Sequence, residues 1–183
     1  MMHRQRYKFA IPLCLLLSIA IQIGAKNTAP SEYAVKAAFL YNFTKFAEWP
    51  EDVLNNRDSL KICIFGTNPF GSNLDKTVAG KKAHSKPIKI IYTTEVNDII
   101  DCQMVFLASN NKKQIEEALT AVTNLSIITV SDLPEFASNG GMIGFYIDDK
   151  RVRFEINRRA VHQSDLSFSS RLLKIARIVQ EEE

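Results

Sequence analysis

Residues 60–71 read LKICIFGTNPFG, and this stretch decides the fold. Residues 60–65 are an apolar run rich in isoleucine, which predicts a buried strand, and Gly66 ends it. The turn at 68–71 then leads into a short predicted helix at 72–79. A buried strand that passes directly into a helix is the repeating unit of an α/β domain.

The same alternation continues downstream. Further strands are predicted at 86–92, 102–107 and 125–130, with a helix at 112–122 and a helical turn at 133–137. Strands alternating with helices favour a largely parallel sheet that is flanked by helices on both faces.

The two ends of the chain complete this α/β architecture. Residues 142–147 and 151–156 predict a C-terminal antiparallel hairpin, followed by a closing helix over 168–179. A first helix begins after a Ser31 cap and stops before Pro50. The apolar face expected for it consists of Val35, Ala38, Phe39, Phe43, Phe46 and Trp49.

The N-terminus has the pattern of a cleaved secretory signal. Three cations (Arg4, Arg6 and Lys8) precede an apolar run at 9–23. That run is about 15 residues, shorter than the ~20 that span a bilayer, so an anchor is the weaker alternative. We expect cleavage after Ala25, a signal peptide at 1–25, and a single exported domain at 26–183.

Removal of the signal also changes the charge of the chain. The whole sequence has 23 basic and 20 acidic residues, and the three signal cations account for its net charge of +3. A balanced mature chain has no overall field that attracts nucleic acid, so nucleic acid is not an expected partner.

Two cysteines, Cys63 and Cys102, remain after cleavage. In an oxidising compartment we expect them to form a structural disulfide, and two buried free thiols are the alternative. They form no CxxC motif and belong to no zinc-ligand set, so we expect no metal.

The sequence offers no recognisable catalytic set. His84 and His162 are isolated, and no nucleophile elbow, HExxH or phosphate-binding loop is present. We therefore expect no enzyme activity and no cofactor.

Two places could bind a ligand or a partner. One is the strand-to-helix loop with Gly66, Asn68 and Gly71, where ligands often sit in open α/β sheets. The other is the polar side of the hairpin, with Arg153, Glu155 and Asn157. An ordinary turn and a solvated hairpin face are the respective alternatives.

Four segments together resemble the YfiR family of periplasmic proteins, over about residues 32–178. They are EYAVKAAFLYNF at 32–43 running to EWP at 48–50; ICIFG and NPFG at 62–71; GGMI and VRFEIN at 140–157; and SSRLLKIAR at 169–177.

The resemblance implies a non-enzymatic regulator. Such proteins bind the periplasmic domain of an inner-membrane diguanylate cyclase and repress it, which controls cyclic di-GMP and biofilm signalling. An outer-membrane, peptidoglycan-associated lipoprotein can sequester them. The resemblance also implies a homodimer and a disulfide placed as Cys63–Cys102 would be, while a second family cysteine pair near the hairpin is absent here.

Two hypotheses follow. The first is a repressor whose candidate partner face combines Phe39 and Phe43 of the first helix with Arg171 and Lys174 of the last. The alternative is a periplasmic small-molecule-binding sensor module that acts on another membrane signalling protein.

Overall fold

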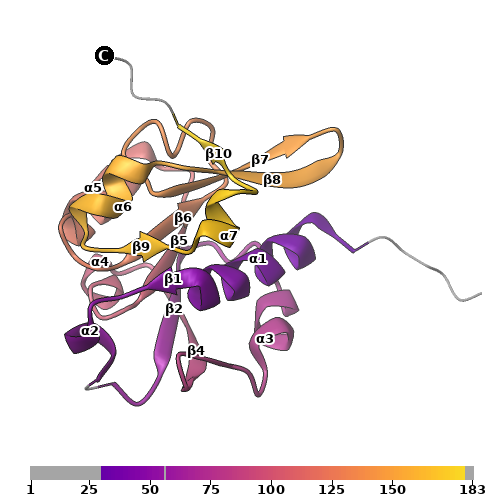
Figure 1. Ribbon diagram of the computed structural model, residues 1–183. Coiled ribbons are helices and arrows are strands. Elements are labelled where there is room, and N and C mark those ends of the chain that lie inside the picture. The colour runs from indigo at the N-terminus through magenta and orange to yellow at the C-terminus, as the bar shows by residue number, and fades with distance from the viewer. Residues whose placement is uncertain (1–29, 56, 180–183) are drawn as a thin grey trace, which may run out of the picture.

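The computed structural model describes residues 30–55 and 57–179. The expected signal peptide at 1–25 therefore lies outside the described residues. Within them, the main sheet has the strand order β10-β8-β7-β6-β5-β2-β4-β3 (Figure 1). Its strands are β2 Leu60–Gly66, β3 Lys82–Ala83, β4 Lys86–Thr93, β5 Met104–Ala108, β6 Ile128–Ser131, β7 Ile143–Asp148, β8 Arg151–Ile156 and β10 Arg177–Ile178.

The centre of this sheet is parallel, as predicted. Strands β4, β2, β5, β6 and β7 pair in parallel, and β8 returns antiparallel to β7. The hairpin turns at Asp149 and Lys150, whose φ angles are 44° and 59°. Positive φ at both central residues is typical of the two-residue turns whose twist matches a hairpin.

Helices cover both faces of the sheet, as the sequence predicted. On one face Ile62 and Ile64 contact the first cluster of the core, which includes side chains of α1, α3, α6 and α7. On the other face Cys63 and Phe65 pack with α4 and α5. Strand β2 is apolar from Ile62 to Phe65 because both of its faces are covered there. The helices are α1 Glu32–Phe46, α2 Glu51–Asn55, α3 Asn73–Val78, α4 Val96–Ile99, α5 Lys112–Val122, α6 Arg158–Gln163 and α7 Ser170–Leu173.

The first helix ends earlier than predicted. The Ser31 hydroxyl caps it, but α1 stops at Phe46, well before Pro50. The reason is that β1 (Ala47–Glu48) pairs antiparallel with β9 (Ser167–Phe168). Its buried face also differs from the expected one, because Ala38 is exposed. The buried residues are Lys36, Ala37, Leu40, Phe43 and Thr44.

The closing helix is also shorter than predicted. It forms one turn, α7, capped by Ser169, and the chain then enters β10. Strand β10 pairs parallel with β8, with Arg177 beside Glu155. Residues 133–137, predicted as a helical turn, form non-helical turns. None of the described helices has the length and apolarity that crossing a membrane requires.

Candidate functional site

A buried lysine lies at the carboxyl end of the parallel strands. Lys36 is 3% exposed, and its Nζ lies 2.5 Å from Glu32 Oε1 and 2.5 Å from Asp132 Oδ2. Glu32 and Lys36 are one helical turn apart in α1, whereas Asp132 directly follows β6. The Tyr33 hydroxyl donates to the same Asp132 oxygen at 2.8 Å. These four residues form what we call the α1–β6 polar cluster.

The electrostatics of the α1–β6 polar cluster favour a fixed ion pair. Two carboxylates and the Tyr33 ring, whose centroid lies 4.4 Å from Nζ, surround the Lys36 ammonium. Burial, followed by the hydrogen bond to Asp132, raises the pKa of Tyr33 to about 12. The phenol therefore stays protonated, and the cluster ties α1 to the sheet rather than offering a free base or nucleophile.

The predicted loop after β2 lies at the same end of the sheet. Gly66 has φ +96°, and an added Cβ would come within 3.0 Å of the Ala108 carbonyl oxygen, so the close approach of β2 and β5 requires glycine. Asn68 uses its side chain within the turn, donating to Gly71 O at 3.1 Å and accepting from Phe70 N at 2.9 Å. Gly66, Asn68 and Gly71 thus shape a tight turn, and their role in ligand binding stays a prediction.

A cavity also lies near these strand ends, between α5 and the segment after β6. Its volume is about 410 Å³. Apolar side chains dominate its wall, and the polar residues that also line it are Ser109, Asn110, Lys112, Glu116 and Asn139. The apolar lining residues are Ile115, Leu119, Leu133, Pro134 and Phe136.

The hairpin residues do not form one polar surface. Glu155 is 9% exposed and accepts two hydrogen bonds from Arg177, the Nε bond being 3.0 Å long. That hydrogen bond is the main cause of a raised pKa of Arg177. Asn157 caps α6 and donates to Ala137 O at 2.8 Å. Arg153 is exposed on β8, and its role in binding a partner stays a prediction.

Two residues of the candidate partner face line a cavity of about 160 Å³ between α1 and α7, which we call the α1–α7 groove, and a partner role for this face stays a prediction. Phe39 from α1 and Arg171 from α7 both line it, and Ile175 beside them is 63% exposed. Lys174 is exposed on the neighbouring turn. The full lining is Phe39, Asn42, Phe46, Arg171, Leu172 and Ile175.

Phe43 does not belong to this face, which corrects the sequence-based expectation. It is fully buried, and its ring lies 5.7 Å from that of Phe145 and 5.0 Å from that of Phe154. Because the hairpin folds over this side of α1, Phe43 is a core residue.

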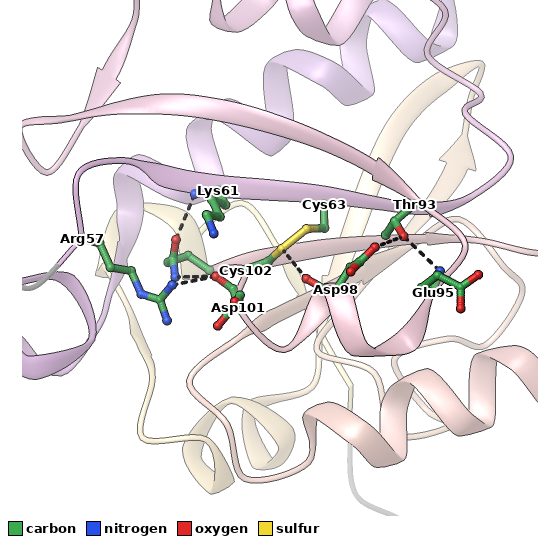
Figure 2. Close-up of a disulfide and its surroundings, with 9 residues drawn as sticks. Arg57, Lys61, Cys63, Thr93, Glu95, Asp98, Asp101 and Cys102 are labelled. Atoms are coloured by element: carbon green, nitrogen blue, oxygen red, sulfur yellow. Dashed lines mark hydrogen bonds between the residues drawn. A yellow bond between two sulfur atoms is a disulfide. The ribbon is translucent and has the colours of Figure 1, made fainter.

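The two cysteines are joined, as predicted. Cys63 in β2 and Cys102 before β5 form a disulfide with a Cα–Cα distance of 6.1 Å (Figure 2). Both are buried in the second core cluster. Beside the bridge, Arg57 donates to the Asp101 carbonyl at 2.8 Å and the Gln103 side chain accepts from Lys61 N at 2.9 Å.

The isolated histidines have ordinary surroundings. His84 Nε2 lies 3.0 Å from Thr44 O, and its ring packs edge-on against Trp49. His162 is exposed at the end of α6. Over residues 30–55 and 57–179, no three His, Cys, Asp or Glu side chains are grouped so that they could hold a metal ion.

Sequence reasoning missed the α1–β6 polar cluster. Lys36 stands within an apolar helix, and Asp132 directly follows a predicted strand, but nothing local links them. A lysine on an otherwise apolar helical face is the one signal that could have indicated a buried ion pair.

Comparisons with known proteins give one family and a fold. The family described as YfiR/HmsC-like matches residues 33–177. No curated protein matches the chain. Among solved structures, the ABC domain in complex with L-Trp from Streptococcus pneumonia is similar, with a TM-score of 0.52 and 9% identity over 80% of this chain. A conserved domain protein from Vibrio cholerae O1 biovar El Tor has a TM-score of 0.48 and 10% identity over 84% of this chain.

These structural likenesses are limited in extent. This chain covers 60% of the first structure and 62% of the second. At such low identity, the first shows a shared fold alone.

Proposed function

This chain belongs to the YfiR/HmsC-like family, and from that premise we propose that it represses an inner-membrane diguanylate cyclase by binding its periplasmic domain directly. The family comprises periplasmic regulators of diguanylate cyclase signalling and is regulatory rather than catalytic. To this general role we add the proposal that the protein represses the cyclase by direct contact and thereby affects cyclic di-GMP and biofilm.

The α1–α7 groove is the observation that carries this proposal. Ile175 is the most exposed of the large apolar side chains described, and it lies beside a groove that Phe39 and Arg171 also line. Interface centres are enriched in aromatic and arginine side chains, which bind through buried apolar area together with directional hydrogen bonds. We therefore assign the cyclase contact to this groove, with Lys174 at its rim.

The same face allows exchange between partners. An outer-membrane, peptidoglycan-associated lipoprotein that covered the groove would release the cyclase, because two partners with overlapping sites cannot bind together. The partner with the larger ratio of local concentration to dissociation constant then sets the cyclase activity. We also infer that the repressor is a homodimer, delivered to the periplasm by cleavage of residues 1–25.

The test is a substitution at the exposed centre of this face. Ile175→Asp should abolish recovery of the membrane cyclase from detergent extracts and raise cellular cyclic di-GMP to the level of a deletion strain. Ile100→Asp is the matched control, because Ile100 is also exposed but follows α4 on the other face of the sheet. If the tagged wild-type protein recovered no membrane protein and deletion left cyclic di-GMP unchanged, the proposal would fail.

A small-molecule sensor is the second candidate function, and the cavity beside α5 favours it. Its volume of about 410 Å³ lies within the usual range for ligand pockets, and it opens at the carboxyl ends of parallel strands. A thermal-shift screen with nucleotides, amino acids and vitamins tests this function. A positive compound should lose its effect in Leu119→Trp, which fills the cavity, and a flat response across the screen argues against a sensor.

A further inference from the structure

The outer edge of β4 is open over most of its length. Strand β3 pairs only with Lys86 and Pro87, and the Ile88 N–H donates to Lys81 O at 3.3 Å. From Lys89 to Thr93, within the part of the chain that the structure describes, β4 has a strand neighbour on the β2 side alone. An open edge of this length can pair with another strand, because its outward N–H and C=O groups lack partners.

The side chains on this edge are suited to pairing. Ile90 and Tyr92 point to the α3 face, where the Tyr92 hydroxyl donates to Asp75 Oδ2 at 2.5 Å. Ile91 points to the opposite face, and Tyr92 remains 45% exposed. Isoleucine and tyrosine are residues that stabilise cross-strand pairs.

Charge is distributed unevenly along this edge. Lysines gather at its beginning, and Glu95 and Asp98 follow its end. The lysines are Lys81, Lys82, Lys86 and Lys89. Among residues 30–55 and 57–179, neither Lys89 nor Asp98 takes part in an ion pair. The Thr93 hydroxyl donates to Asp98 Oδ2 at 2.6 Å, which holds that carboxylate beside the end of β4 (Figure 2).

We propose that β4 pairs antiparallel with β4 of a second copy of this chain, across a twofold axis at Ile91. Ile91 is the middle residue of the open segment from Lys89 to Thr93, because β3 covers the edge only up to Pro87. An axis at Ile91 therefore pairs the whole open segment with its copy. It places Ile90 opposite Tyr92 of the second copy, and Lys89 opposite Thr93. Lys89 then lies near Asp98 of the second copy, so the basic end of each strand meets the acidic end of the other. The inference rests on the homodimer proposed above, and it names the interface.

A charge swap tests this interface on the full mature, oxidised chain. The wild type should sediment as a dimer. Lys89→Glu and Asp98→Lys should each weaken self-association by about tenfold, because two symmetry-related attractions become repulsions. The double variant should restore wild-type affinity. Lys112→Glu on α5 is the control, since Lys112 is exposed on another element. Unchanged far-ultraviolet circular dichroism spectra show that the variants remain folded.

The alternative outcomes separate the two proposals. A chain that stays monomeric at every concentration overturns both the homodimer and the β4 interface. A dimer that neither single variant weakens overturns the β4 interface and leaves the homodimer intact. Weakening by both single variants without rescue by the double variant overturns the twofold pairing at Ile91. Repression of the cyclase is measured separately with Ile175→Asp, whose position does not lie on β4.

Discussion

Lys36 and Asp132 are 96 residues apart in the chain, yet Lys36 Nζ lies 2.5 Å from Asp132 Oδ2. Lys36 is buried in α1, whereas the Asp132 side chain keeps 21% of its surface exposed at the end of β6. This ion pair holds the first helix against the parallel sheet together with the apolar packing of Leu40 and Phe43.

Replacing Asp132 with Asn should lower the free energy of unfolding by about 2–4 kcal/mol, because the Lys36 charge stays buried. Its remaining carboxylate partner, Glu32, is 47% exposed and compensates poorly. Urea unfolding measures the loss. Lys45→Met is the control, since Lys45 is exposed and should change stability by less than about 0.5 kcal/mol. An unchanged midpoint in Asp132→Asn would show that the pair contributes nothing.

Stability should also fall at alkaline pH through Tyr33. Its pKa in the folded chain is about 12 against an ordinary 10.0, chiefly because of burial and then the Asp132 hydrogen bond. Between these values the folded chain keeps a proton that the unfolded chain has lost. The contribution of Tyr33 is therefore complete below pH 10 and disappears as the pH rises towards 12.

Urea midpoints followed from about pH 9 to about pH 12 check this dependence. The wild type should lose more stability over the window than Tyr33→Phe, which has no phenolic proton to lose. Tyr41→Phe serves as the control. Parallel curves for the wild type and Tyr33→Phe would contradict the assignment.

Reduction of Cys63–Cys102 should destabilise the domain by up to about 4 kcal/mol, because the bridge closes a loop with a sequence separation of 39. Free-thiol titration of the denatured, oxidised mature chain should detect no thiol until a reductant is added. The double variant Cys63→Ala/Cys102→Ala should unfold at a similar denaturant concentration whether or not reductant is present. Two thiols reacting without reductant would refute the bridge in solution.

Phe43→Ala should cost about 3–5 kcal/mol of stability, because it empties a site among the rings of Phe145 and Phe154. Phe39→Ala should cost less, since Phe39 is only partly buried, and should weaken cyclase binding. Melting temperature and pull-down separate the two effects. A stable Phe43→Ala protein that no longer binds the cyclase would reverse the assignment of these residues.

The sequence was informative wherever local pattern and packing agree. The strand at 60–65 and the helix at 112–122 were correctly predicted, because continuous apolarity and helical periodicity reflect the faces that the sheet buries. The position of the hairpin turn at 148–150 was also predictable from nearby residues alone, because the turn depends on residues that tolerate positive φ.

The errors arise where distant segments decide the local structure. The first helix stops at Phe46 because Ala47 pairs with Phe168, and no feature near Pro50 reveals that pairing. The closing helix is interrupted because Arg177 reaches Glu155 and the backbone joins β8. The α1–β6 polar cluster could not be predicted for the same reason, because its two halves meet only after the sheet has formed.

The pairing of β1 with β9 also bears on how the chain is made. The Ser167 hydroxyl donates to Glu48 at 3.0 Å, across 119 residues. The strand that follows the first helix cannot form this pairing until almost the whole polypeptide is available, because β9 lies in the last tenth of the chain. A polypeptide whose early and late segments pair in this way folds slowly, because long loops must close before these contacts can form.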